Sequence, residues 1–494
     1  MARGKAFVCA CEDVTLEEVR RAFAAGHRDL ESVKRHTGLG TGPCQGKSCV
    51  AGAVRELARL GATPAEIAPF TVRPPLMPVT LGTLAALDPA GLPLDPGVPR
   101  APRPPPPPPA PRGELPSRAD VVIVGGGIQG LSLAYELTRR GVPDVLVLER
   151  SYLNSGASGR NGGGVRAQWS TPTMVRLARR SLELFARFAP EMGVNVWFRR
   201  GGYLFLAPDE KQVRRLERNL EVQRGFGMRT RIVTPAEVGE IVPGLVTSRF
   251  VAASWNPDDG VIFPWPFLWG YAARVEAAGA KVRTFTPVTG FEISGDAIRA
   301  VVTPAGRVAC RTVVNACGAW SPEVARLAGV TLPSHPTRHE ILVTDPLKPW
   351  LGPLVSALGT GLYFSQSQRG ELVGGMGDPA EPPGLELGST LRFLARFARA
   401  VTDLIPALGP LQVMRQWAGA YDVTPDNNPL LGPAGPANFL QLSGFVGHGF
   451  MMAPAVAELY ADYMTGRGED EIFARFRPDR FEKGTAVRED FIIG

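Results

Sequence analysis

The pattern of apolar and polar residues is clearest between residues 121 and 149. An uninterrupted apolar run, Val121–Val124, predicts a buried strand, and the glycine-rich turn that follows leads into a helix. A second apolar run, Val145–Leu148, predicts a second strand, which delivers an acidic residue, Glu149. Strand, turn, helix, strand and acid follow one another within about 30 residues, as in a dinucleotide-binding unit. A purely structural turn is the alternative, because glycine-rich turns are common.

The small residues of this turn each have a physical role in such a unit. Gly125 permits the tight turn, Gly127 lets the backbone approach a pyrophosphate, and Gly130 lets helix and strand pack closely. The helix N-terminus offers N–H groups and a partial positive charge to the phosphates. Glu149 would accept hydrogen bonds from the ribose hydroxyls. The nucleotide contacts expected here are Gly125, Gly127, Ile128, Gln129, Gly130, Glu149 and Arg150.

Helix-like and strand-like segments alternate along the rest of the chain. An amphipathic helix is expected at about 172–188 and another helix at 267–278. Residues 155–166 contain a dense run of glycines, which indicates backbone lying close against a flat ligand. A buried strand at 311–315 leads into a small-residue turn. Further strand-like runs are expected at 202–206, 250–253, 281–288, 339–343 and 361–365, and a helix after Pro454.

Four of the six cysteines lie in the first 50 residues, as a C-x-C pair and a C-x4-C pair. Helix-like segments separate and follow the pairs, and Thr15 with Glu18 forms a capping-box signature at the start of the first helix. Four cysteines in a cytosolic module suggest a metal before disulfides, and zinc and iron–sulfur clusters both accept four thiolates. The C-x-C spacing is unusual for structural zinc. Buried free cysteines are the structural alternative.

Composition narrows the class of protein. The 494 residues should form more than one domain, and 44% hydrophobic with 20% charged residues fits a soluble protein with a sizeable core. No apolar run approaches the ~20 residues that span a membrane, and the N-terminus lacks the features of a secretory signal, so the cytoplasm is expected. The net charge of +7 is spread without a dense basic block, which favours a solvated surface over nucleic-acid binding.

A proline-rich linker is expected between the cysteine module and the nucleotide-binding unit, at 71–118. Residues 73–81 mix apolar residues with proline and are expected to lie extended along a neighbouring surface. Eight of residues 101–112 are proline, which fixes φ and lacks a donor N–H, so they predict a semi-rigid polyproline spacer. A ligand for a proline-binding domain is the alternative. The spacer is interpreted as a tether between two redox modules.

Residues 1–70 resemble the bacterioferritin-associated-ferredoxin-like [2Fe-2S] domain. The resemblance rests on the segments 9–15 and 37–49, which fill all four cysteine positions. It implies a [2Fe-2S] cluster. Its implied ligands are Cys9, Cys11, Cys44 and Cys49.

Residues 119–494 resemble the D-amino-acid-oxidase-type FAD-dependent amine oxidoreductases, and within them the β subunits of sarcosine oxidase and dye-linked proline dehydrogenase. The motifs are the Gly125–Gly130 turn with Glu149, the Ser158–Gly162 loop, Val314–Trp320 and Gly444–Pro454. The resemblance implies an α/β (α+β) fold. A discontinuous FAD domain (about 119–200, 265–330 and 410–470) would carry an inserted mixed-sheet substrate domain (about 201–264 and 331–409). The further implied FAD contacts are Ser158, Arg160, Asn161, Gly162, Val288, Gly318, Gly444, Gly447, His448, Gly449, Phe450 and Met451.

The same resemblance assigns residues to the amine substrate. Arg166 matches the position that binds a substrate carboxylate, with Arg160 a weaker candidate, and a structural or cofactor-touching arginine is the alternative. Tyr421 matches a tyrosine that lines the site, and Tyr363 lies on a strand that either faces the site or packs in the core. His448 lies near the pyrimidine end of the flavin, where either its side chain or the following helix terminus would supply positive charge.

Three positions depart from relatives of this type. Met451 stands where some relatives carry a lysine, so carboxylate binding would rest on Arg166 alone or the substrate would differ. Gly419 stands where monomeric sarcosine oxidases tether FAD through a cysteine, so FAD should be non-covalent. Pro264 falls near the histidine that holds FMN in heterotetrameric sarcosine oxidase, so covalent FMN is not expected, while a non-covalent FMN between subunits stays open.

The leading hypothesis is a dehydrogenase that oxidises a secondary amine acid, such as proline, hydroxyproline, sarcosine or an opine, to an imine by hydride transfer to FAD. Electrons would leave through the [2Fe-2S] cluster to a partner subunit or carrier, in a hetero-oligomer that is cytoplasmic or peripheral to the inner face of the membrane through its partners. The alternatives are an electron-transfer subunit whose partner carries the chemistry, and an oxygen-using amino-acid oxidase with a structural cluster.

Overall fold

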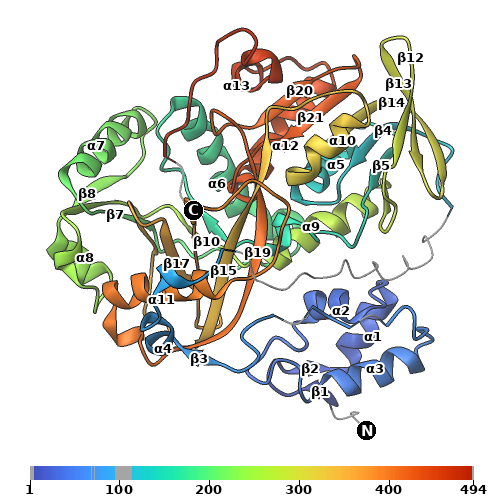
Figure 1. Cartoon of the computed structure of the whole chain (residues 1–494). Coiled ribbons are helices and arrows are strands. Elements are labelled where there is room, and N and C mark those ends of the chain that lie inside the picture. The colour runs from blue at the N-terminus through green and yellow to red at the C-terminus, as the bar shows by residue number, and fades with distance from the viewer. Residues whose placement is uncertain (1–4, 68, 72, 95–113, 492–494) are drawn as a thin grey trace.

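The computed structural model describes residues 5–67, 69–71, 73–94 and 114–491. They form a small N-terminal module and a larger body built on two sheets (Figure 1). The polyproline spacer expected at 101–112 lies outside the described residues. Within the described part of the chain, no helix is both long and apolar enough to cross a membrane.

An eight-stranded sheet carries the predicted nucleotide-binding unit. β4 pairs in parallel with β5 on one side and with β14 on the other, so the two strands predicted around the glycine turn are neighbours. β14 then pairs with β13 through its first half and with β21 through its last residues. The strands are β11 (Lys281–Arg283), β5 (Val145–Leu148), β4 (Arg118–Val124), β14 (Gly306–Asn315), β13 (Ala297–Thr303) and β12 (Gly290–Ser294), with β21 (Phe439–Ser443) and β20 (Leu430–Pro433) branching from β14.

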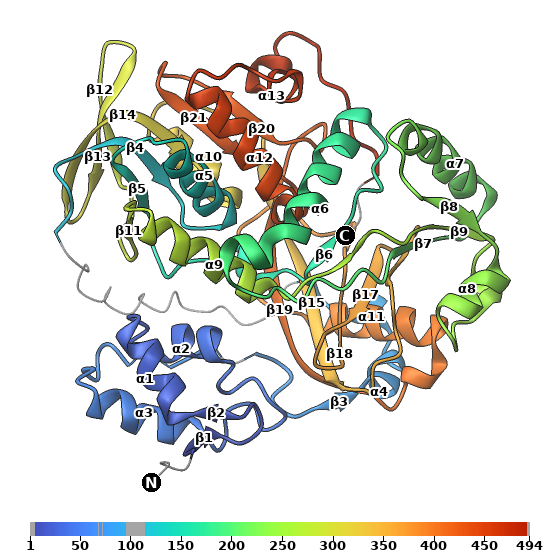
Figure 2. The same cartoon turned by 180° about the vertical axis from the view of Figure 1, so that it is seen from behind.

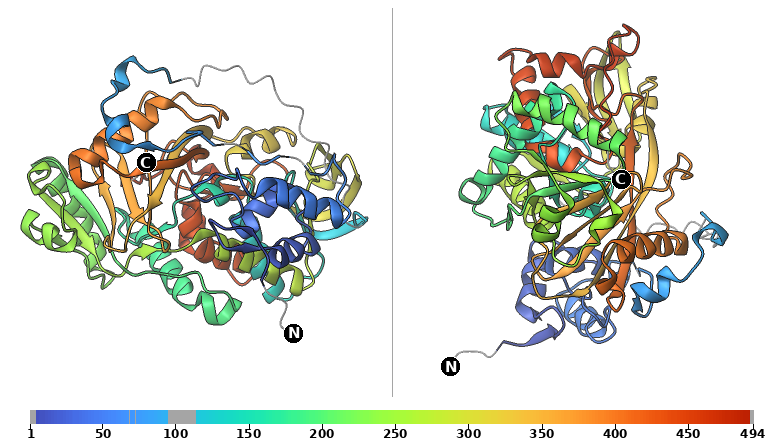
Figure 3. Two further views of the ribbon diagram at one scale, coloured as in Figure 1. Left: turned by 90° about the horizontal axis from the view of Figure 1, so that it is seen from below. Right: turned by 90° about the vertical axis from the view of Figure 1, so that its left-hand side faces the viewer.

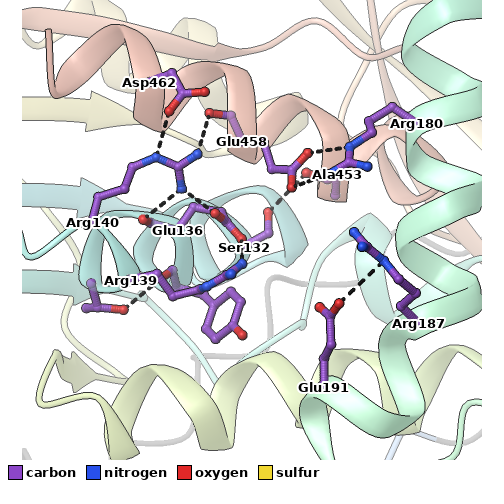
Figure 4. Close-up of polar contacts among 12 residues, drawn as sticks. Ser132, Glu136, Arg139, Arg140, Arg180, Arg187, Glu191, Ala453, Glu458 and Asp462 are labelled. Atoms are coloured by element: carbon purple, nitrogen blue, oxygen red, sulfur yellow. Dashed lines mark hydrogen bonds and ion pairs between the residues drawn. The ribbon is translucent and has the colours of Figure 1, made fainter. Parts of the chain in front are cut away.

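Four helices pack together against this sheet (Figure 2): α5 (Ile128–Arg139), α6 (Pro172–Met192), α9 (Pro264–Ala277) and α12 (Gly449–Met464). Arginine contacts fix their relative positions (Figure 4). Arg140 of α5 ion-pairs with Asp462 of α12 at 2.8 Å, and Arg180 of α6 ion-pairs with Glu458 of α12 at 2.8 Å. α5 and α12 therefore keep a fixed mutual orientation.

A nine-stranded sheet forms the other half of the body. Its two longest strands, β15 and β19, pair antiparallel along most of their length, while β16 and β7 pair in parallel. β19 belongs to this sheet, although it falls in the 410–470 segment expected in the FAD domain. The order is β3 (Val79–Thr80), β19 (Gln412–Val423), β15 (His335–Pro346), β18 (Glu371–Met376), β17 (Leu362–Gln366), β16 (Leu354–Ala357), β7 (Tyr203–Ala207), β9 (Ala252–Asn256) and β8 (Arg231–Val233).

Shorter elements complete the body. β6 pairs with β10 in a separate two-stranded ribbon. Helix α11 packs on α4 and against the nine-stranded sheet. The remaining elements are β6 (Gly164–Val165), β10 (Gly260–Val261), α4 (Leu81–Ala85), α7 (Glu210–Arg224), α8 (Pro235–Ile241), α10 (Ser321–Arg326), α11 (Leu391–Leu404) and α13 (Glu471–Arg475), and the 3-10 turns at 89–91, 157–160, 247–249, 318–320, 406–408 and 478–480.

The N-terminal module lies at one end of the body (Figures 1 and 3). A two-stranded ribbon, β1 (Phe7–Cys9) with β2 (Val14–Thr15), precedes α1 (Leu16–Ala24), α2 (Leu30–Thr37) and α3 (Val50–Arg59). The predicted capping box is confirmed, because Thr15 and Glu18 cap α1 reciprocally.

The chain leaves the module along the nine-stranded sheet. The Gln416 N–H donates to the Pro74 carbonyl at 2.7 Å, and β3 pairs with β19. The extended course expected for residues 73–81 is confirmed at Val79–Thr80, whereas the chain bends at 74, 76 and 77 and is already helical at Leu81.

Candidate active site

A cavity of about 510 Å³ runs between the two sheets of the body. One end is formed by the turn after β4, the loop after β5 and the turn after β14. The other end is formed by side chains from β15, β17 and β19 and by the start of α12. All the cofactor and substrate residues predicted for the body line this cavity, except Gly130 and Gly444.

The turn after β4 fits a closely approaching ligand. Gly125 has φ +115°, and a Cβ there would collide with the Ala316 carbonyl. A Cβ at Gly130 would collide with the Gly125 carbonyl, so helix and turn pack as predicted. The Ile128 N–H at the start of α5 donates to Ser158 Oγ at 3.0 Å. The helix N-terminus and the Ser158–Gly162 loop therefore face the same space.

Glu149 ties the second strand to this turn. Its carboxylate accepts the Gly126 and Ser151 N–H groups, both at 2.8 Å, and burial raises its pKa. Arg150 lies over the Trp320 ring at 4.2 Å. Gln129 donates to the Gly449 carbonyl, while its Oε1 is buried without a partner among the described residues. Turn, acid and an orphaned polar atom fit an FAD at this end of the cavity.

Three aromatic side chains from the nine-stranded sheet stand together at the other end. His339 Nε2 lies 3.0 Å from Tyr363 Oη. The His339 ring stacks on Tyr421, with centroids 4.6 Å apart and planes 10° from parallel. Burial lowers the pKa of His339 to about 4, so the imidazole is neutral near pH 7. Sequence reasoning did not single out His339, although its strand was predicted.

Arg166 lies between these ends and is 2% exposed. One of its terminal nitrogens donates to the Phe491 carbonyl at 2.9 Å, and the other donates to the Gln168 carbonyl. Its guanidinium carbon stands 3.8 Å from the centre of the Trp169 ring. Burial lowers its pKa. Within the described residues, no carboxylate forms an ion pair with it.

The start of α12 closes the cavity near Arg166. His448 stands just before α12, edge-on to Trp169 with ring centroids 4.6 Å apart. Burial lowers the pKa of His448 well below its usual value, and the charge of Arg166 adds to the effect. A neutral His448 leaves the Arg166 guanidinium and the N-terminus of α12 as the sources of positive charge at this end. Phe450 and Met451 line the cavity from the first turn of α12.

Polar side chains of the Ser158–Gly162 loop form hydrogen bonds within the protein. Arg160 donates to the Ala418 carbonyl at 2.8 Å and to the Ser155 carbonyl at 3.1 Å. Asn161 donates to the Ser158 carbonyl and accepts the Gly163 N–H. The weaker carboxylate candidate, Arg160, therefore braces the loop while lining the cavity, and Arg166 is likewise held by two backbone carbonyls.

The four module cysteines are neighbours in space. The thiol of Cys11 contacts that of Cys44, and the thiol of Cys9 contacts that of Cys49. Burial opposes ionisation of Cys44, but N–H groups of Ser48, Gly46 and Lys47 directed at its sulfur contribute to a net lowering of its pKa. The described residues contain no group of three or more His, Cys, Asp or Glu side chains arranged as a ready metal site. Cysteine thiolates are the ligand type of iron–sulfur clusters, so the donor type is present in the described residues although a ready arrangement is not.

A buried charge cluster joins the module to the cavity wall. Glu31 accepts contacts from Arg35 at 2.8 Å and Lys34 at 3.0 Å, with Arg73 at 3.9 Å. Arg35 also donates to the Gly159 carbonyl at 3.3 Å. Burial lowers the pKa of Lys34 to about 8 and that of Arg73 to about 9. One carboxylate therefore faces several cations beside the loop that lines the cavity.

Comparisons with known proteins divide the chain in the same way. The sequence model of the family "FAD dependent oxidoreductase" matches residues 120–463. That of the "Sarcosine oxidase A3 domain" matches residues 3–88. The second match corrects the expectation of a bacterioferritin-associated-ferredoxin-like family for the module.

Individual relatives cover most of the body. Sarcosine oxidase subunit beta of Rhodobacter capsulatus is 28% identical, over 76% of this chain and 92% of that one. Mouse mitochondrial dimethylglycine dehydrogenase is 28% identical, over 76% of this chain but only 46% of that one. The crystal structure of L-proline dehydrogenase from P. horikoshii is 38% identical with a TM-score of 0.72, over 76% of this chain and 100% of that one.

Proposed function

This chain belongs to the family of FAD-dependent oxidoreductases, and on that premise we propose that it oxidises a secondary or N-methylated amino acid, including proline-like ones. The observation that carries the proposal is Arg166, a guanidinium 2% exposed that lines the cavity without a carboxylate partner among the described residues. The relatives named for sarcosine, dimethylglycine and L-proline support the same class of substrate.

Arg166 points to a carboxylate because a buried charge is costly unless it is paired. Backbone carbonyls satisfy part of the guanidinium, and the negative charges of Glu489 and Asp259 act on it without forming an ion pair. A planar guanidinium binds a carboxylate through two parallel hydrogen bonds, which would fix the direction of the substrate. Met451, where some relatives have a lysine, leaves Arg166 as the carboxylate cation proposed for this site.

The aromatic residues would place and deprotonate the amine. A substrate ammonium close to the Arg166 guanidinium is disfavoured, so the amine would lose its proton on binding. Neutral His339, 3.0 Å from Tyr363 Oη, would receive that proton only in passing, because a pKa of about 4 makes it a weak base that cannot hold the proton near pH 7. Tyr421, stacked on His339, would close the apolar side of the pocket.

The cavity-lining residues Gly125, Gly127–Gln129 and Glu149 and the start of α12 would hold FAD. When bound, FAD supplies the acceptor for a hydride that leaves the carbon next to nitrogen, giving an imine. Gly419, in the position of a tethering cysteine in other enzymes, supports non-covalent FAD.

We propose that a [2Fe-2S] cluster is held by the four module cysteines, Cys9, Cys11, Cys44 and Cys49. With such a cluster the enzyme would be a dehydrogenase that passes electrons to a partner subunit. The two thiol pairs and the N–H groups directed at Cys44 support this. Iron and acid-labile sulfide analysis, with electron paramagnetic resonance of the reduced protein, tests it. A Cys49→Ser variant should lose the cluster signal but keep FAD. If the protein bound neither iron nor sulfide after treatment with both, the cluster proposal would be contradicted.

Anaerobic mixing of the FAD-loaded protein with sarcosine, dimethylglycine, L-proline and hydroxyproline tests the catalytic proposal. At least one should bleach the oxidised flavin spectrum. A primary amino acid such as L-alanine serves as the comparison and should act more slowly. If no secondary or tertiary amino acid reduced the flavin while dithionite did, the chain would be a cofactor-holding subunit and not the amine-oxidising one.

A further inference from the structure

We propose that the C-terminal segment Val487–Phe491, here named the C-terminal latch, is a positioning element that holds Arg166 in the orientation that receives the substrate carboxylate. This inference rests on the proposed function of Arg166. It assigns a role in substrate binding to residues more than 300 positions away from the arginine in sequence.

The latch is anchored to the turn that follows β19. Asn428 donates to the Val487 carbonyl at 2.8 Å, and Asn427 donates to the Glu489 carbonyl at 3.0 Å. The Glu489 N–H donates to the Asp426 carbonyl at 3.0 Å. A buried ion pair between Asp426 and Arg480, at 2.8 Å, fixes this turn. The latch therefore has a defined path and is not a loosely attached end.

Glu489 connects the latch to the segment just after Arg166. Its fully buried carboxylate accepts the N–H groups of Ser170 and Thr171, each at 3.2 Å, and the Thr171 hydroxyl at 2.9 Å. α6 begins at Pro172, so the carboxylate also lies at the N-terminus of a 21-residue helix, where negative charge is stabilised. No lysine or arginine forms an ion pair with Glu489 within the described residues, although its negative charge acts on Arg166 and favours the charged guanidinium.

Phe491 completes the latch at Arg166 itself. Its carbonyl accepts the guanidinium hydrogen bond at 2.9 Å. Its ring is 1% exposed and packs edge-on to Phe205, with centroids 4.7 Å apart. Residues 166–171 are thus held at both ends by one segment, with Trp169 over the guanidinium between them.

Such positioning matters because an arginine side chain has many rotamers, and binding pays for freezing them. A guanidinium held beforehand by a fixed carbonyl loses less freedom when the carboxylate arrives. The competing explanation is that the latch only stabilises the fold by capping α6. A structural role predicts equal effects on every ligand, whereas a positioning role predicts an effect confined to carboxylates.

The test uses FAD-loaded protein and two probes, pyrrole-2-carboxylate and its neutral amide, titrated while the flavin spectrum is recorded. The first pair consists of two shortened chains. One ends after Ala486 and lacks the latch. The other ends after Ile492, so that the Phe491 carbonyl remains part of a peptide bond. The second pair is Glu489→Gln and the control Glu482→Gln, which removes the charge of an exposed glutamate outside the latch.

We expect the Kd for the carboxylate to rise about 10- to 100-fold without the latch, with a smaller rise in Glu489→Gln. The amide Kd and both controls should stay unchanged. If Glu489→Gln and wild type bound the carboxylate with equal Kd values, the proposal that the latch positions Arg166 would be overturned. This holds whether or not the shortened chain folds. If the wild-type protein did not bind the carboxylate probe, the proposed function would be contradicted, and so would the proposed role of the latch.

Discussion

The imidazole Nε2 of His339 and the phenolic oxygen of Tyr363 lie 3.0 Å apart, on two strands of the same sheet, with ring planes 12° from parallel. This pair faces the cavity together with Arg166. Because burial keeps His339 neutral, the pair would relay a proton from a bound amine without retaining it. The predictions below follow from this arrangement and from the charges around it.

Replacing His339 by glutamine should slow flavin reduction by the amine by about 10²-fold, the low end of what a general base contributes, because a pKa of about 4 makes His339 a weak base. The substitution keeps a hydrogen-bonding group but removes the basic nitrogen. Rapid-mixing measurement of flavin reduction under anaerobic conditions checks it. His335→Gln is the matched control, because that histidine is exposed at the start of the same strand. An unchanged rate in His339→Gln would remove His339 from the proton-transfer step.

His339 also makes stability depend on pH. Its pKa is about 4 in the folded protein and about 6.5 when unfolded, so the unfolded chain binds the proton more readily. Its contribution to stability is complete above about pH 6.5 and is lost as pH falls toward 4. Buried neutral His448 acts in the same direction. As pH falls through this window, the temperature of thermal unfolding should decline less steeply in His339→Gln than in wild type. If the two proteins declined in parallel, the low pKa of His339 would be contradicted.

The glycine turn should not accept alanine at Gly125. A Cβ there would collide with the Ala316 carbonyl, and φ +115° is strained for any side chain. The purified Gly125→Ala protein should therefore contain little or no FAD. Gly384→Ala is the control, because a Cβ at Gly384 would meet nothing within 4 Å. Full FAD occupancy in Gly125→Ala would show that the glycine turn after β4 is not where FAD binds.

Glu31 should be essential for docking of the module. Burial opposes its ionisation, but Arg35, Lys34 and Arg73 together lower its pKa. Glu31→Gln would leave those cations without their carboxylate, which costs about 3–5 kcal/mol for a buried pair. Limited proteolysis should then cut between module and body faster than in Glu17→Gln, where an exposed pair with Arg21 is lost. Equal cleavage rates would place the docking energy elsewhere.

How much the sequence predicts depends on how local each feature is. The Gly125–Gly130 turn, Glu149 and the Thr15 capping box are contained within short segments, so residue type and spacing determine them. His339 was missed because it lies at the start of an apolar run, where a histidine carries no distinguishing spacing. The Phe491 carbonyl that receives Arg166 could not be predicted, since the contact joins distant segments through a backbone group with no sequence signature. The pairing of β19 with β15 likewise depends on tertiary packing.

The central claim is that Arg166 binds the carboxylate of an amine that reduces the flavin. The most direct measurement compares anaerobic flavin reduction by L-proline and by L-prolinamide, in wild type and in Arg166→Gln. We expect wild type to favour proline strongly and Arg166→Gln to lose about 2–5 kcal/mol of that preference, as expected when one partner of a buried charge pair is removed. If prolinamide reduced the wild-type flavin as readily as proline, or Arg166→Gln kept the full preference, Arg166 would not be the carboxylate site.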